Sequence, residues 1–246
     1  MNVRIYNDRN ELVRSLKWKA DTGFNRRTWG MEEKGYRSPG SPKPRPGAAE
    51  IPGLQAVPGT YKVVLSLGKE SDSTLVTLKD DPRLNKTADV RNAQRRLMDE
   101  LRRTTDRLTE AMDRLAESEE TLGKISGSLR GLEGKENDSL RKATTRMQDS
   151  IKVLREFIGG KKNEKQGLSR DNDMTVLSGI QLAQGYIMSK SIAPGEQERA
   201  LVTNAGKLID SAVERVNAFY ATHWKAYRQH YDATQVKLFK DYEPIR

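Results

Sequence analysis

Hydrophobic residues change their spacing along the chain, from every second position before about residue 80 to every third or fourth position after residue 87. The later spacing is clearest for leucines that recur every seven residues, at Leu101, Leu108, Leu115, Leu122 and Leu129. Such a stripe covers one side of an amphipathic helix. We therefore expect a helix from about Leu84 or Thr87 to about Leu129, roughly 65 Å long at about 1.5 Å per residue.

Three further helices are predicted from the same spacing and from residues that begin or end helices. The second starts at the capping side chain of Asp138 and ends at Gly159-Gly160. The third follows residue 171 or 172 and ends before Pro194, which lies in the first turn of the fourth. Short connections reverse the chain, so we expect an antiparallel bundle with four helices at its far end and a two-helix stalk beside the N-terminal part.

The N-terminal part alternates hydrophobic and polar residues, which is typical of half-buried strands. We predict strands over residues 3–6, 12–18, 61–67 and 74–78, and a short strand over 25–29 whose Trp29 fills the core. Asn7-Asp8 and Gly68-Lys69 supply the turns of two hairpins. Residues 35–58 contain too many prolines for a central strand and are expected to form a long loop.

These patterns predict an α+β protein with two domains. A small β-sandwich occupies residues 1–85, and an elongated antiparallel four-helix bundle occupies residues 86–246. Hydrophobic residues make up 35% and charged residues 32% of the chain, which favours an elongated shape over a compact sphere.

Composition excludes several classes of function. The chain has no cysteine, so disulfides, thiolate metal sites and cysteine nucleophiles are excluded. No run of residues is apolar enough for a membrane span or a signal peptide, and a signal for export would lie outside this chain. The net charge of +10 divides evenly between residues 1–85 and the remainder, with acidic and basic residues interleaved. This distribution indicates solvated helix faces and argues against nucleic-acid binding.

No motif indicates a catalytic, cofactor or metal site. His223 and His230 are seven residues apart on the fourth predicted helix, about 10 Å along its axis, so one metal ion cannot bridge them. Acidic residues of the first predicted helix are spaced to pair with nearby arginines, which explains them without acid–base chemistry. The leucine stripe has partner helices within the chain, so we favour an intramolecular core, with a dimer through the helical region as the alternative.

The candidate interface is a group of aromatic residues on the fourth predicted helix: Tyr220, Trp224, Tyr227, Tyr231 and Phe239. In an antiparallel bundle this end of the fourth helix returns to the start of the first. We therefore expect some of these side chains to pack against the β-sandwich. The alternative is an exposed platform for a ligand.

Several N-terminal segments, taken in order, resemble a known arrangement. They are Ile5-Tyr6-Asn7-Asp8, Leu12-Val13-Arg14-Ser15-Leu16, Gly23-Phe24-Asn25-Arg26-Arg27-Thr28-Trp29-Gly30-Met31, Pro58-Gly59-Thr60-Tyr61-Lys62-Val63-Val64-Leu65 and Asp81-Pro82-Arg83-Leu84. This part of the chain resembles the C-terminal region of secreted bacterial sortilin-like proteins with Asp-box (BNR) β-propeller repeats. In that family an Ig-like module, related to the Ig domain of the flagellar hook capping protein, precedes a helical tail.

The resemblance implies an Ig-like sandwich in an extracytoplasmic setting, secreted or at the cell surface. The chain contains no Asp-box repeats, so a glycosidase activity of the family has no catalytic residues in it. We therefore expect a non-enzymatic accessory region that contacts an upstream domain or a separate protein, the helices presenting the surface for the partner. Two alternatives remain: the C-terminal part of a glycan-acting hydrolase whose propeller lies outside the chain, and a basic coiled-coil protein that binds nucleic acid.

Overall fold

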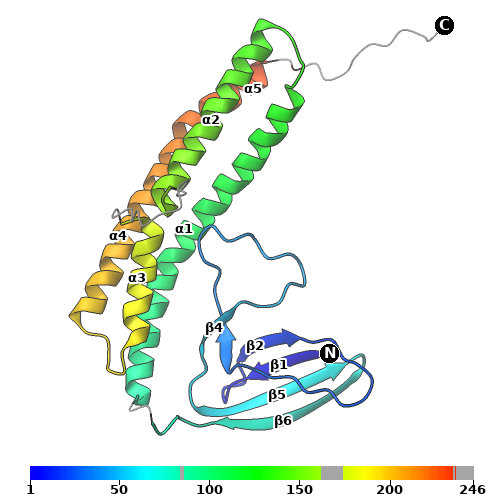
Figure 1. Cartoon of the computed structure of the whole chain (residues 1–246), viewed down its shortest axis with the longest axis vertical. Coiled ribbons are helices and arrows are strands. Elements are labelled where there is room, and N and C mark those ends of the chain that lie inside the picture. Colours follow the sequence, from blue (N-terminus) through cyan, green and yellow to red (C-terminus); the bar gives the residue numbers. More distant parts are fainter. Residues whose placement is uncertain (84–85, 162–173, 235, 237–246) are drawn as a thin grey trace, which may run out of the picture.

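The computed structural model describes residues 1–83, 86–161, 174–234 and 236, and it has a mixed α+β fold in which a small antiparallel sheet region precedes the helices (Figure 1). Phe239 and residues 84, 171 and 172, which the sequence predictions include, lie outside the described residues. None of the helices in the described parts of the chain is long and apolar enough to cross a membrane.

Six strands form two small antiparallel sheets. The strands are β1 (Asn2–Tyr6), β2 (Leu12–Lys17), β3 (Glu32–Lys34), β4 (Pro52–Gln55), β5 (Gly59–Leu67) and β6 (Glu70–Leu78). The larger sheet has the order β2-β1-β5-β6, and β3 pairs with β4 in the smaller one. Both predicted hairpins are confirmed, because β1 pairs with β2 and β5 with β6 in antiparallel register.

The larger sheet has a small hydrophobic core. Val3, Ile5 and Tyr61 are its fully buried members, and the Trp29 ring packs edge-on against Tyr61 with the ring centroids 5.7 Å apart. The prediction that Trp29 belongs to a strand is wrong, since residues 25–29 form no strand. The Asn25 side chain instead exchanges hydrogen bonds with the backbone of Asp21, which holds this segment in a local turn.

The smaller sheet lies in segments that the sequence predicted as loop or left unassigned. β4 begins with Pro52, and a proline is tolerated at the first residue of an edge strand. The backbones of Gly35 and Gly53 approach so closely that a Cβ added at Gly35 would lie 2.3 Å from the Pro52 carbonyl oxygen. This contact between two glycines allows β3 and β4 to pair, and hydrophobic alternation gives no sign of it.

The helices contain most of the described residues after Thr87. They are α1 (Ala88–Ser128), α2 (Lys135–Gly159), α3 (Val176–Ser189), α4 (Glu196–Phe219), the π-helical turn η1 (Tyr220–Trp224) and α5 (Lys225–Ala233). The Thr87 hydroxyl caps α1 by accepting a hydrogen bond from the Val90 amide. The long first helix and its leucine stripe are confirmed, because all five leucines of the stripe are buried.

The predicted alternation of helix directions is wrong, because the chain does not reverse between α2 and α3. Near its start, α1 contacts the end of α3 through the Gln94 side chain, which donates to the Ile187 carbonyl. Further along, Glu119 of α1 pairs with Arg155 of α2. Both α2 and α3 therefore run antiparallel to α1 and lie beside successive parts of it (Figure 1).

Contacts of α4 complete this arrangement. Arg107 pairs with Asp210, and the Ser118 hydroxyl contacts the Tyr220 hydroxyl at 2.9 Å, so α4 runs parallel to α1. Among the described residues, α3 packs against both α1 and α4, and α2 packs against α1, α4 and α5, so no two-helix stalk exists there. Only a short connection forces the next helix to run in the opposite direction, and the segment between α2 and α3 is too long to do so.

Candidate functional site

The aromatic residues predicted to contact the sheet pack within the helical region instead. Phe219 and Tyr227 are buried there, with Tyr220 and Trp224 packed against the same core. The Tyr227 hydroxyl contacts the Thr144 hydroxyl of α2 at 2.8 Å. For the described members of this group, the prediction that some of them pack against the β-sandwich is therefore wrong. Because α4 runs parallel to α1, its end lies at the end of α1 that is far from the sheets (Figure 1).

The same group does not form an exposed ligand platform in the described residues. Burial raises the pKa of the Tyr220 and Tyr227 hydroxyls, which indicates a poorly solvated environment. Tyr231 alone among the described members is substantially exposed, at 37%. His223 packs near the Phe219 ring, and no group of three or more potential metal-binding side chains occurs in the described parts of the chain.

A different set of residues joins the two regions of the molecule. We call residues 35–51, which connect β3 to β4, the strap. A buried arginine of β2, Arg14, fixes the start and end of the strap: its guanidinium donates to the carbonyl groups of Glu33, Glu50 and Ile51. The Ser15 amide adds a hydrogen bond of 2.7 Å to the Glu50 carboxylate. These bonds replace the regular pairing that the proline-rich segment cannot make.

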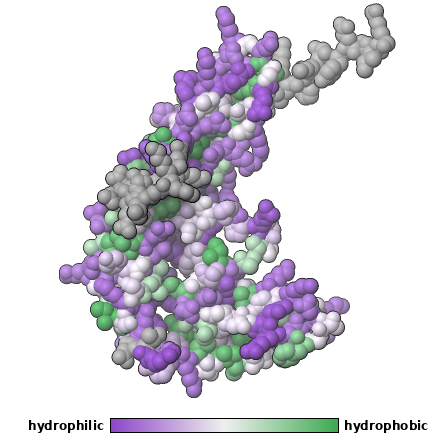
Figure 2. All heavy atoms as spheres, in the orientation of Figure 1, coloured by the Kyte–Doolittle hydropathy of each residue, from purple (hydrophilic) through white to green (hydrophobic). Residues whose placement is uncertain are grey.

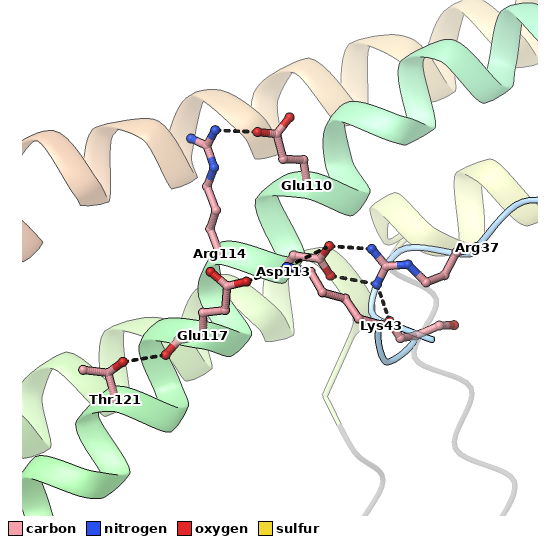
Figure 3. A network of polar contacts seen from close by, with 8 residues as sticks. Arg37, Lys43, Glu110, Asp113, Arg114, Glu117 and Thr121 are labelled. Atoms are coloured by element: carbon pink, nitrogen blue, oxygen red, sulfur yellow. Dashed lines mark hydrogen bonds and ion pairs between the residues drawn. The ribbon is translucent and has the colours of Figure 1, made fainter. Parts of the chain in front are cut away.

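The strap is attached to the middle of α1 by ion pairs (Figure 3). The Arg37 guanidinium donates to both carboxylate oxygens of Asp113, at 2.7 and 2.5 Å, and also to the Ser41 carbonyl of the strap at 2.6 Å. One turn further along α1, Glu117 accepts from the Lys43 ammonium at 2.5 Å. The Arg37 hydrogen bonds hold the pKa of Asp113 below its usual range, since they favour the charged carboxylate.

Two arginines near the start of α1 make a second attachment. Arg95 pairs with Glu33 and donates to the Gln55 carbonyl at 3.2 Å, and Arg91 pairs with Asp80. Arg and Asp or Glu side chains from distant parts of the chain therefore hold the sheets against one side of α1. We call these pairs, together with the strap contacts of Arg37 and Lys43, the clamp.

Beside the clamp, an open cleft of about 500 Å³ lies between the strap, β4, α1 and α3. The surface is concave where the β region projects from the helices (Figure 2). Its lining residues come from four segments: Glu33, Lys34, Gly35, Tyr36, Arg37, Ser38 and Pro39; Ile51, Pro52, Gly53 and Leu54; Arg95, Met98, Asp99, Arg102, Thr105 and Asp106; and Leu177, Ile180, Gln181, Gln184 and Met188.

Every charged side chain that lines the cleft has a partner of opposite charge. Seven such residues line it, namely Glu33, Lys34, Arg37, Arg95, Asp99, Arg102 and Asp106, and each is within 4.0 Å of an opposite charge. The Arg102 guanidinium also stacks on the Tyr36 ring, 4.2 Å from its centroid. The groups that a ligand can contact without competing for an ion pair are therefore neutral.

The sequence did not indicate this cleft because its parts are distant along the chain. Arg37 and Asp113 are separated by 76 positions, and nothing in the spacing of either residue identifies the other. The one available signal is weak: Asp113 and Glu117 are one helical turn apart, on a side of α1 that the leucine stripe does not use.

Comparisons with known proteins identify no relative. A scan against protein-family models found no matching model, and neither the curated proteins nor the solved structures gave a match.

Proposed function

We propose that the chain is a non-catalytic interaction region of a larger secreted or cell-surface protein. Its β region, residues 1–85, is an Ig-like module that packs on an upstream domain or a separate protein, and the helical region presents a second surface for a partner. The resemblance of the N-terminal segments to the tail of sortilin-like proteins supports the secreted setting.

The observation that carries this proposal is the uncovered edge of the larger sheet. β6 is the last strand in the order β2-β1-β5-β6, and eight of its nine residues are exposed. Leu75 in its centre is 69% exposed. Proteins ordinarily protect an exposed edge with charged residues or prolines. Residues 73–78 contain neither. An edge of this kind is suited to pair with, or pack on, a neighbouring protein surface.

Site-specific photo-crosslinking in the source cells tests the proposal. We would place a benzophenone amino acid at Leu75 and, as a control, at exposed Arg130 at the far end of α1. The proposal predicts one dominant protein adduct at Leu75 that Arg130 does not give. The same adduct in equal yield at both positions, or no adduct at Leu75, would contradict it. Hydrolysis of glycans by the longest natural gene product that contains this chain would instead favour the enzyme alternative.

A further inference from the structure

The cleft has the shape of an open trough. Its floor on α1 extends from Arg95 to Asp106, and one wall on α3 extends from Leu177 to Met188. At about 1.5 Å per residue, each of these stretches is roughly 16 Å long. An extended chain advances about 3.3 Å per residue, so about five residues of extended peptide fit along the trough.

The charge pairing described above limits the chemistry of a ligand. Arg95 and Arg102 are the arginines on the floor, and both are already bound to carboxylates. A phosphate or a nucleic acid would compete with these carboxylates for the arginines and would be repelled by them. A ligand without charge keeps every pair intact.

The available neutral groups suit a polypeptide. Tyr36 is 57% exposed, although the Arg102 guanidinium stacks on one face of its ring. The stacking restricts the ring, so Tyr36 offers an ordered aromatic surface. Ile51 of the strap and Met188 of α3 are exposed hydrophobic side chains that line the cleft. Gln181 and Gln184 lie about one turn apart on α3, and each carboxamide can both donate to and accept from a peptide group.

We propose that the cleft binds an extended, uncharged polypeptide segment of about five residues. Its hydrophobic side chains pack against Tyr36, Ile51 and Met188, and its backbone forms hydrogen bonds with Gln181 and Gln184. This cleft is distinct from the β6 edge, so it can bind its ligand whether or not that edge is covered.

Selection from a phage-displayed library of random peptides tests this proposal. The bait is the whole chain, and the selected peptides are then measured against two variants whose melting matches the parent. Gln184→Lys places a charge in the cleft, whereas Gln229→Lys makes the same change on an exposed part of α5. We expect uncharged peptides whose affinity falls at least about tenfold with Gln184→Lys and stays within about twofold with Gln229→Lys.

Three results would overturn the proposal. One is no enrichment of peptides over a library exposed to no bait. Another is selected peptides that bind both variants equally, because their site is then elsewhere. The third is binding of neutral glycans on an array that Gln184→Lys abolishes, without any peptide selection, since the cleft would then be a carbohydrate site.

Discussion

The helical region and the β region differ in how much of their own stability they can supply. The helices share one continuous core that extends from Leu97 to Tyr227, whereas the core of the larger sheet has Val3, Ile5 and Tyr61 as its buried hydrophobic members. Burial of hydrophobic side chains is the main favourable contribution to folding. We infer that the helical region is stable by itself, and that the β region depends on the clamp to α1.

This difference explains why charged residues gather on one side of α1. A sheet with a small core gains stability from any contact that fixes its loops, and the strap has no regular pairing of its own. The bidentate pair of Arg37 with Asp113 lies in a half-buried position, where such pairs are stronger than on an open surface. Substitutions in the helical core, the strap anchor and the clamp should therefore have effects of decreasing size.

The largest effect is expected for Leu115→Ala in the helical core. Leu115 is fully buried at the centre of the leucine stripe, so its truncation leaves a cavity and should lower the free energy of unfolding by about 3–5 kcal/mol. Urea unfolding followed by far-ultraviolet circular dichroism measures this. Leu182→Ala, at a partly exposed position of α3, is the control and should cost under about 1 kcal/mol. Equal losses for both would show that the leucine stripe is not the core.

The next effect concerns Arg14, which anchors the strap. Arg14→Met keeps most of the side-chain volume but removes the donors to three carbonyl groups, so we expect the β region to lose about 2–4 kcal/mol. In a background that retains only Trp29, fluorescence during urea unfolding reports on this region. Arg9→Met changes an exposed arginine in the turn between β1 and β2, and its unfolding curve should match that of the parent. A parent-like curve for Arg14→Met would show that the hydrogen bonds of Arg14 do not stabilise the β region.

A smaller effect is expected for Asp113→Asn in the clamp. It removes a carboxylate that Arg37 and Lys43 share, and should cost the β region about 1–2 kcal/mol. Glu110→Gln breaks an exposed pair with Arg114 within α1 and should cost about 0.5 kcal/mol or less.

The Asp113 contribution also has a defined pH dependence. The pKa of Asp113 is lower in the folded protein than the value of about 3.9 for an unfolded chain. Its stabilisation is therefore complete above that unfolded value and is lost as the pH falls through the lower folded pKa. Urea unfolding at several acidic pH values should show the difference between parent and Asp113→Asn shrinking as the carboxyl is protonated. A difference that grows on acidification would contradict the pairing.

The smallest effect is expected for Tyr36→Leu. It removes the stacking with Arg102 and should lower the stability of the β region by about 0.5–1 kcal/mol. Fluorescence of a variant that retains only Trp29 measures it, with Tyr6→Leu, at a partly buried position of β1, as a comparison. If Tyr36→Leu leaves the stability of the β region unchanged while Asp113→Asn lowers it, only the ion pairs of the clamp contribute to that stability.

The accuracy of the sequence predictions follows from how local each interaction is. The leucine stripe depends on residues a few positions apart, and it located α1 to within a few residues. The hairpins β1–β2 and β5–β6 were likewise found from adjacent turns. The direction of α3, the pairing of β3 with β4 and the contact of Arg37 with Asp113 depend on residues far apart in sequence. Periodicity carries no information about such contacts, so the cleft could not be predicted.

The central claim is that the β region depends on the clamp whereas the helical region does not. Two single-tryptophan variants test it most directly, one retaining Trp29 beside the sheet core and one retaining Trp224 in the helical core, each with and without Asp113→Asn. Urea unfolding followed by fluorescence should give an earlier transition for Trp29 than for Trp224, and Asp113→Asn should lower only the Trp29 midpoint. A single transition common to both tryptophans, shifted equally by Asp113→Asn, would contradict the account.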